Sequence, residues 1–320
     1  MTGPSRQIGY NLQTLAWSLW TELGVRGVVR NHSDCAIDPE PLILFTSRLR
    51  NSDPRLRDES IDWCIRNLRL LSVARLRNLL KEADQSSRDA FSEYASIVNS
   101  NSPARWPLGE GIPQRDFRRS RKSTLPDFKR PALIHLRLRS LFGVGARAEI
   151  IAALLARPNV DMSSSDLARL NNYTKRNISD VMEGLKMAAL VKATRTGNQV
   201  RYRLNRRQEL IDLIGNLPSS FPLWTTVFQL LDTVFRVSLE FQSKKHEVSG
   251  VEAHQALNKM APILEQLDLT APTQQPNAAQ YWKSFVTWGS HLTASLASGK
   301  SYLCGRRSPP KRHRTKSKKK

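Results

Sequence analysis

Basic and amide side chains that could read DNA bases lie together near the middle of the chain. Lys175, Arg176 and Asn177 are consecutive, and they begin a segment whose apolar residues recur at helical spacing. Arginine can donate two hydrogen bonds to guanine, and asparagine can pair with adenine, in the major groove of double-stranded DNA. The first turn of a helix can carry such side chains into that groove. These residues therefore predict contact with base edges.

Further cationic and polar residues extend this set. Arg201 and Arg203 lie in a β-type segment, where they could contact phosphates or the minor groove. Asp180 and Glu183 are unfavourable near phosphates, so either base contacts are confined to the first turn or these carboxylates accept from cytosine. The predicted DNA-binding residues are Arg169, Thr174, Lys175, Arg176, Asn177, Ser179, Arg195, Asn198, Arg201 and Arg203.

Local signals predict the elements before these residues. Residues 147–156 have the apolar face of a helix. Ser163 and Asp166 have the spacing of a capping box, which would begin a short helix at 164–170. Residues 171–173 are Asn-Asn-Tyr, and asparagine tolerates the left-handed conformation of a tight turn. A helix, a short helix and a turn are therefore expected in this order.

The next elements carry the basic residues. Thr174 is placed to cap a helix over 175–189, in which the apolar residues share one face. Residues 190–194 and 200–204 have β-type composition, and the Gly- and Asn-containing sequence at 195–199 suits a hairpin turn. The second strand alternates apolar and cationic residues, so one of its faces is predicted to be basic.

Helix, short helix, turn, helix and basic hairpin are the parts of a winged helix-turn-helix. The stretch SSSDLARLNNYTKRNISDVMEGLKMAALVKATRTGNQVRYRL resembles ArsR- and MarR-type bacterial repressors. The resemblance covers residues 146–205 only. It implies that 174–189 is the recognition helix, that 196–199 is the wing tip, and that the chain is a sequence-specific regulator of transcription.

Winged helices also serve as protein-interaction or dimerisation modules. The alternative is therefore an interaction protein, such as an antitoxin, whose flanking helical domains hold a partner while the winged helix provides autoregulation. An enzyme is not expected, because no phosphate-binding or nucleophile motif is present. Asp58, Glu59 and Asp62 alternate with arginines at helical spacing, which favours surface ion pairs over acid–base catalysis.

Cysteine and histidine usage gives no sign of a metal or another cofactor. Cys35, Cys64 and Cys304 are odd in number and lack C-x-x-C spacing, so reduced buried thiols are expected. Residues 146–205 contain neither cysteine nor histidine, which argues against a metal-sensing repressor.

Net charge points to a polyanionic partner. The chain carries 50 Lys and Arg against 28 Asp and Glu, a formal charge of +22. Residues 306–320 include nine basic residues and no acidic one, which predicts a disordered basic tail. No run of eighteen apolar residues is present, so we expect a soluble, cytoplasmic protein without a membrane partner.

Apolar residues at helical spacing, with helix start and stop signals between them, predict a mainly α-helical protein in several parts, with the winged helix flanked by two helical domains. Trp17 and Trp20 are expected to pack inside the first helical domain or against a partner. Residues 132–141 alternate apolar and basic side chains; we favour a helix there and assign it to a possible homodimer contact. The predicted parts are an N-terminal helical domain at 1–98, a basic and poorly ordered linker at 99–131, the winged helix at 132–217, a C-terminal helical domain at 218–299 and the tail at 300–320.

Overall fold

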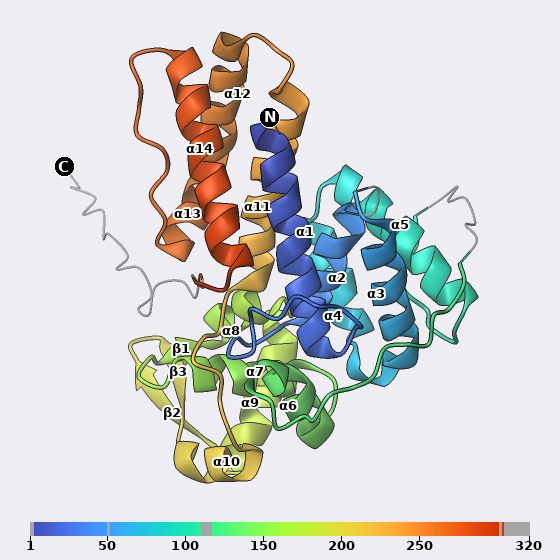
Figure 1. The fold of residues 1–320 in the computed structure, drawn as a ribbon. Coiled ribbons are helices and arrows are strands. Elements are labelled where there is room, and N and C mark those ends of the chain that lie inside the picture. Colours follow the sequence, from blue (N-terminus) through green and yellow to red (C-terminus); the bar gives the residue numbers. More distant parts are fainter. Residues whose placement is uncertain (1–2, 50–51, 110–116, 301–302, 304–320) are drawn as a thin grey trace, which may run out of the picture.

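The computed structural model describes residues 3–49, 52–109, 117–300 and 303. Within these ranges it contains fourteen α-helices, two 3-10 turns and one three-stranded antiparallel sheet (Figure 1). The mainly helical class predicted from the sequence is therefore confirmed. The tail at 306–320 and Cys304 lie outside the described residues.

The N-terminal region folds as five helices. They are α1 (Pro4–Leu23), α2 (Pro39–Arg48), α3 (Pro54–Arg66), α4 (Val73–Glu82) and α5 (Gln85–Ser100), with the 3-10 turn η1 at Leu68–Leu70. Proline in the first turn begins α1, α2 and α3, since its fixed φ suits a helix start. Asp53 caps α3 by accepting from the Leu56 amide, and Ser72 caps α4 by accepting from the Arg75 amide.

Helices from the two ends of the chain share one hydrophobic core. The C-terminal helices are α11 (Trp224–Phe241), α12 (His246–Lys259), α13 (Ala261–Leu267) and α14 (Ala278–Ala297). α1 packs against α11 and α14, and Phe45 of α2 stacks on Phe228 of α11 with 4.3 Å between ring centroids. Separate domains are predicted for 1–98 and 218–299, whereas one cluster of buried side chains contains residues of both. We call α1–α5 with α11–α14 the helical body.

The described part of the predicted linker is held against the helical body. Its first two residues end α5, and its other described residues, 101–109 and 117–130, contain no helix or strand before the 3-10 turn η2 (Pro131–Leu133). The Thr124 amide donates to the Gly24 carbonyl at 3.0 Å, and Arg66 donates to the Ser123 carbonyl at 2.7 Å. Gly24 has a φ of 103°, and a Cβ there would lie 1.8 Å from the Thr124 carbonyl oxygen. These contacts fix 123–124 on α1 and α3, unlike a poorly ordered linker.

Asp62 also differs from its expected place in a surface ion pair. Its side chain is buried, accepting from Arg119 Nε at 3.1 Å and from the Arg121 amide at 3.0 Å. Asp58 does pair with its neighbour Arg57, at 2.7 Å. Asp62 therefore anchors residues 119–121 of the linker to α3. These partners lie far from Asp62 in the sequence, so helical spacing within α3 could not identify them.

Residues 134–214 form a second unit, the middle unit, with its own hydrophobic cluster. Its elements are α6 (Ile134–Phe142), α7 (Ala146–Ala156), β1 (Met162–Ser163), α8 (Ser164–Asn171), α9 (Lys175–Met187), β2 (Val191–Thr196), β3 (Gln199–Leu204) and α10 (Arg207–Ile214). β1 and α10 are not among the elements predicted from the sequence. α6 is a helix, as predicted, and it lies between the two cores: Leu136 belongs to the first cluster and Leu138 to the second.

The sheet of the middle unit has the order β1-β3-β2, and both pairings are antiparallel. The predicted five-residue loop at 195–199 is shorter in the structure, because Thr196 pairs with Gln199 and only Gly197 and Asn198 form the turn. Gly197 has a φ of 58°, which glycine adopts without steric cost. The short turn lengthens the hairpin beyond the core.

Single side chains in the helical body agree with the sequence expectations in part. Cys35 and Cys64 are buried, as expected. Trp20 is fully buried and donates to Thr46 Oγ1, whereas Trp17 is half-buried and donates to Asp53 Oδ2 at 2.6 Å. Among the described residues, no helix combines the length and apolar character needed to cross a membrane.

Candidate nucleic-acid interface

The start of α9 presents consecutive polar side chains to solvent. Thr174 Oγ1 accepts from the Asn177 amide and so caps the helix as predicted. Ile178, Met182 and Leu185 are buried in the middle unit and fix which face of α9 is turned inward. The three side chains of the first turn, Lys175, Arg176 and Asn177, are consequently exposed, and Ser179 is half-buried.

The turn before α9 is held by the helical body. Asn172 takes the left-handed conformation, with a φ of 55°. The Asn171 carbonyl accepts from Arg75 Nε at 3.1 Å. The Asn172 carbonyl accepts from Asn78 at 3.0 Å, and its side-chain oxygen accepts from Thr225 at 3.1 Å. Side chains of α4 and α11 therefore hold the turn from which α9 begins.

The hairpin β2–β3 has one cationic face. Cross-strand partners lie on the same face, and the register pairs Lys192 with Arg203 and Thr194 with Arg201. Two cations directly opposite each other repel, so an anion bound between them would be stabilised. Lys192 is exposed and is absent from the predicted set. The signal that could have found it is the hairpin register, which follows once a two-residue turn at 197–198 is chosen.

The remaining predicted hairpin residues lie elsewhere. Arg195 pairs across the strands with Val200, which places it on the opposite face from Arg201 and Arg203. Asn198 is exposed in the turn. The structure thus divides the predicted wing residues between two faces and a tip, instead of one surface.

Several predicted residues have acidic neighbours. Arg203 Nε pairs with Asp161 at 2.8 Å, and Arg201 donates to the Asp161 carbonyl at 3.0 Å. Arg169 lies 3.6 Å from Asp166, which also completes the predicted capping box with Ser163. The Arg203 and Arg169 pairs are solvent-exposed, so they contribute little and leave both cations able to exchange partners.

The exposed face of α9 changes character after its first turn. Asp180 and Glu183 are exposed there, Lys186 pairs with Glu183 at 3.6 Å, and Met187 is 86% exposed. A phosphate backbone would be repelled by these carboxylates. Within the middle unit, the start of α9 and the hairpin would therefore suit a polyanion better than the rest of this face.

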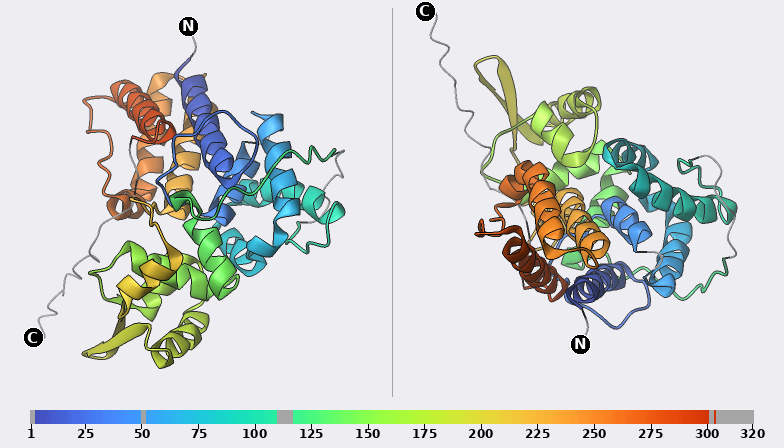
Figure 2. Two further views of the ribbon diagram at one scale, coloured as in Figure 1. Left: turned by 60° about the horizontal axis from the view of Figure 1, so that its bottom comes forward. Right: turned by 90° about the horizontal axis from the view of Figure 1, so that it is seen from above.

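Figure 2 shows how these parts are disposed in the whole molecule. In its right panel the hairpin β2–β3 projects from the side opposite to α1. Its left panel brings forward the lower side of Figure 1, which carries the middle unit. The hairpin thus projects away from the helical body, which contains α1 and α14.

A second, buried set of charges joins the middle unit to the helical body. Arg139 of α6 pairs with Glu40 of α2 at 2.6 Å and with Glu149 of α7 at 2.7 Å. Arg75 of α4 contacts the same carboxylates, at 3.1 Å for Glu40 and 3.6 Å for Glu149. Their side chains are at most 3% exposed. Buried charges of this kind are tolerated only when they are paired and hydrogen-bonded.

Electrostatics within this network favours the charged forms. Burial alone would raise the pKa of Glu149, but the charges of Arg139, His135 and Arg75 hold that pKa well below its ordinary value. Burial would lower the pKa of Arg139, whereas Glu149 and Glu40 raise it above its ordinary value. Each group therefore stabilises the ionised state of its partners.

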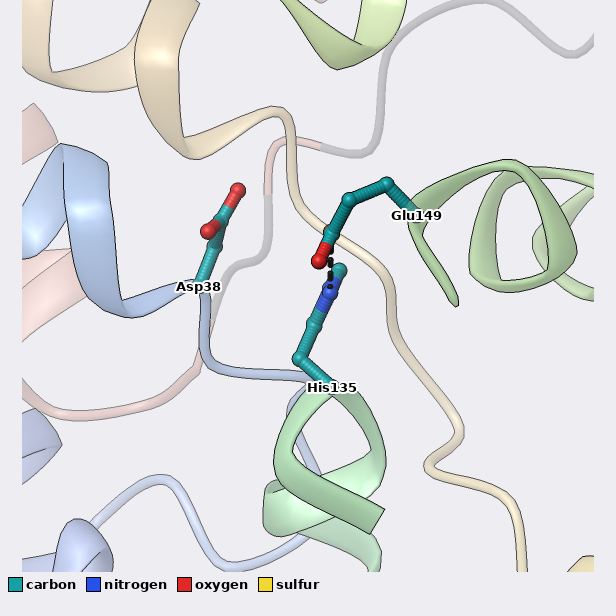
Figure 3. A group of neighbouring side chains, drawn as sticks. All are labelled: Asp38, His135 and Glu149. Carbon is teal, nitrogen blue, oxygen red and sulfur yellow. Dashed lines mark hydrogen bonds and ion pairs between the residues drawn. The ribbon is translucent and has the colours of Figure 1, made fainter. Parts of the chain in front are cut away.

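Asp38, His135 and Glu149 have the composition of a metal-ligand trio. Each brings one ligand atom within 4.8 Å of the others, and His135 Nδ1 lies 2.8 Å from a Glu149 oxygen (Figure 3). These carboxylates already neutralise Arg75 and Arg139, and Arg75 also contacts Asp38 directly. A divalent cation would add positive charge beside two buried guanidinium groups, so the trio does not fit a metal ion.

Sequence reasoning missed the buried network, although one signal was present. Arg137 and Arg139 interrupt an apolar segment, and Glu149 is the single acidic residue of an apolar helix. A charged residue in such a context is a candidate for a buried ion pair. The partners themselves could not be chosen, because Glu40 and Arg139 are separated by 99 positions.

No family model, curated protein or solved structure matches the chain.

Proposed function

We propose that the middle unit is a winged helix-turn-helix that binds double-stranded DNA, and that the chain regulates transcription. In this proposal α8 and α9 are the helix-turn-helix, α9 is the recognition helix and β2–β3 is the wing. The observation that carries the proposal is the exposed first turn of α9 together with a hairpin face bearing Lys192, Arg201 and Arg203.

In this proposal α9 and the hairpin would have different roles in binding DNA. Arg176 and Asn177 are side chains that can hydrogen-bond base edges, and their place in the first turn suits entry into the major groove. The cationic face of the hairpin would bind phosphates, which positions the protein without reading sequence. Residues 146–207 contain twelve Lys and Arg against five Asp and Glu, so this unit favours a polyanion even without the tail.

The experiment is a titration of the purified full chain against a duplex that it selects from a random library and against a scrambled version. Fluorescence polarisation at about 50 and 200 mM salt separates specific binding from charge-driven binding. We expect wild type to prefer the selected duplex and R176A/N177A to lose that preference. Arg6→Ala is the matched control, because Arg6 is exposed near the start of α1. Failure to enrich any sequence would contradict base reading, and absence of binding to both duplexes would contradict DNA binding altogether.

A second candidate function is supported by the rest of the exposed face of α9. Gly184 has open space around it, and Met187 is 86% exposed beside Asp180 and Glu183. The carboxylates of Asp180 and Glu183 would repel phosphates, so this part of the helix suits a protein partner better than DNA. Met187→Ala with unchanged DNA affinity, but reduced capture of a partner protein, would favour an interaction role for this helix.

A further inference from the structure

Residues 117–124 cross the helical body without regular secondary structure, and we call them the strap. The Asp62 side chain of α3 accepts from Arg119 Nε at 3.1 Å and from the Arg121 amide at 3.0 Å. The Thr124 amide donates to the carbonyl of Gly24, directly after α1. Because Asp62 is buried, these bonds tie the strap to the core of the helical body.

Arg121 has a backbone conformation that is uncommon for its residue type. Its φ is 56°, in the left-handed region that is unfavourable for a residue with a Cβ. The bond from its amide to Asp62 stabilises this conformation. The backbone that carries the side chains of Arg121 and Lys122 is therefore fixed, and both side chains are exposed.

Exposed cations gather around the strap. Arg66 of α3 donates to the Ser123 carbonyl at 2.7 Å, and Arg26 follows Gly24 by two residues. No ion pair between described residues includes any cation of this group. We call the group the strap surface, and its members are Arg26, Arg66, Arg118, Arg121 and Lys122.

Carboxylates near the strap do not cancel this charge. Asp62 is buried, and Glu59 is half-buried and accepts from Ser120 Oγ at 2.8 Å. Asp127, beyond the strap, is exposed, as is the cation Lys129 two residues later. The excess of positive charge on the strap surface therefore suits a partner with closely spaced negative charges.

The residue types favour a phosphate backbone over a lipid surface. Four of the five cations are arginines, whose planar groups can donate two hydrogen bonds to one phosphate. A membrane-binding surface also inserts several apolar side chains between lipids. Phe117 and Leu125 are instead half-buried against the core, and the exposed Val28 offers a single small side chain. A nucleic acid needs no such insertion, because its phosphates supply the affinity.

The strap surface and the hairpin β2–β3 belong to different sides of the molecule. The strap is bonded to the end of α1, and in the right panel of Figure 2 the hairpin projects from the side opposite to α1. The protein itself lies between them. A straight duplex held by α9 and the hairpin would therefore leave the strap surface open to another duplex.

We propose that the strap surface binds the phosphate backbone of a second DNA duplex, so that one chain holds two duplexes at once. The strap contact does not depend on base sequence, because phosphates carry no sequence information. Holding two duplexes rests on the proposed DNA-binding function, whereas contact between the strap surface and DNA does not.

The experiment measures capture of one duplex by another. The selected duplex is fixed to beads, the full chain is bound to it, and retention of a fluorescent scrambled duplex is measured at low salt. We expect wild type to retain the second duplex, and R118E/K122E to retain at least about fivefold less, since two phosphate contacts become repulsive. K244E/K245E is the matched control, because it makes the same change of charge at two exposed lysines between α11 and α12. It should retain the second duplex as wild type does.

Folding and base reading should be unaffected by R118E/K122E. Both side chains are exposed, and neither is hydrogen-bonded to another described residue. The unfolding midpoint and the preference for the selected duplex should therefore equal those of wild type. Residues 306–320 are the same in every variant, so a contribution from that basic segment cancels. Wild-type retention by R118E/K122E would overturn the proposal.

A second measurement separates the strap surface from the proposed function. In the R176A/N177A background, adding R118E/K122E should weaken binding to scrambled duplex and reduce the slope of log affinity against log salt by about 1.8. Adding K244E/K245E should leave that slope unchanged. Equal slopes in all three would overturn the strap contact, whereas a chain that selects no sequence but shows this difference would contradict only the proposed function. If R118E/K122E lost binding to phosphatidylserine vesicles yet retained the second duplex, the surface would bind membranes and the proposal would be wrong.

Discussion

Arg139 and Arg203 carry the same guanidinium group in opposite environments. Arg139 is 0% exposed and bonds to Glu40, to Glu149 and to the Leu70 carbonyl. Arg203 is 46% exposed and has a single carboxylate neighbour, on Asp161. The buried group cannot leave its partners without leaving charges unpaired, whereas the exposed group can exchange its partner for a phosphate at little cost. The comparison separates a structural arginine from one available to a ligand, which net charge cannot do.

Replacing each arginine by methionine should give the largest difference in the free energy of unfolding between the two sites. Arg139→Met leaves Glu40 and Glu149 buried with too few cations, and should lower the free energy of unfolding by about 3–5 kcal/mol. Arg203→Met should change it by less than about 1 kcal/mol. Urea unfolding followed by circular dichroism measures both. Equal stability of the two variants would remove the distinction.

Lowering the pH should reduce the stability that the buried ion-pair network contributes, and should leave the contribution of Arg203 unchanged. The folded-state pKa of Glu149 is lowered, so its contribution to stability is complete above the ordinary pKa of about 4.3 and is lost as the pH falls through the lower folded-state value. We therefore expect the free energy of unfolding to decrease as the pH falls below about 4.3. The decrease should be smaller than the loss in Arg139→Met, because acid protonates only one carboxylate of the network. Glu149→Gln should reduce this pH dependence, while Arg203→Met should retain it. An unchanged profile in Glu149→Gln would assign the acid sensitivity to other carboxylates.

Among the exposed residues, Arg176 should have the largest effect on DNA. Arg176→Ala should weaken binding to the selected duplex by about 1–3 kcal/mol and relax the preference at one or two base pairs. Its unfolding midpoint should match wild type, because Arg176 is exposed and none of the ion pairs in the described chain includes it. Competition titrations with single-base variants of the duplex measure the preference. An equal loss on the scrambled duplex would show that Arg176 contacts only the backbone.

The hairpin should show the smallest and least specific effects. Arg203→Ala and Lys192→Ala should each reduce the slope of log affinity against log salt by about 0.9, on selected and scrambled duplex alike. Arg195→Ala should have less effect than Lys192→Ala, because Arg195 lies on the opposite face of the hairpin. A larger effect for Arg195 would place the DNA on that other face.

Local features of the site could be predicted because their causes lie within a few residues. The capping box of Ser163 and Asp166, the left-handed Asn172 and the cap at Thr174 each depend on groups no more than three positions apart. Amphipathic spacing placed Ile178 and Met182 inside and Arg176 outside for the same reason. Lys192 required one further step, the register of two neighbouring strands.

The remaining features depend on contacts between distant segments. Arg139, Glu149 and Asp62 each carry a charge that residue type alone would place at the surface, yet each is buried because a partner from another segment meets it. A cavity of about 550 Å³ between the helical body and the middle unit arises in the same way, because Leu79 of α4 and Ala152 of α7 both line it. Periodicity along the chain determines which face of a helix is apolar. Burial of a charge, or the opening of a cavity, depends on which elements pack together, and that is decided only when Glu40 and Arg139, 99 positions apart, come into contact.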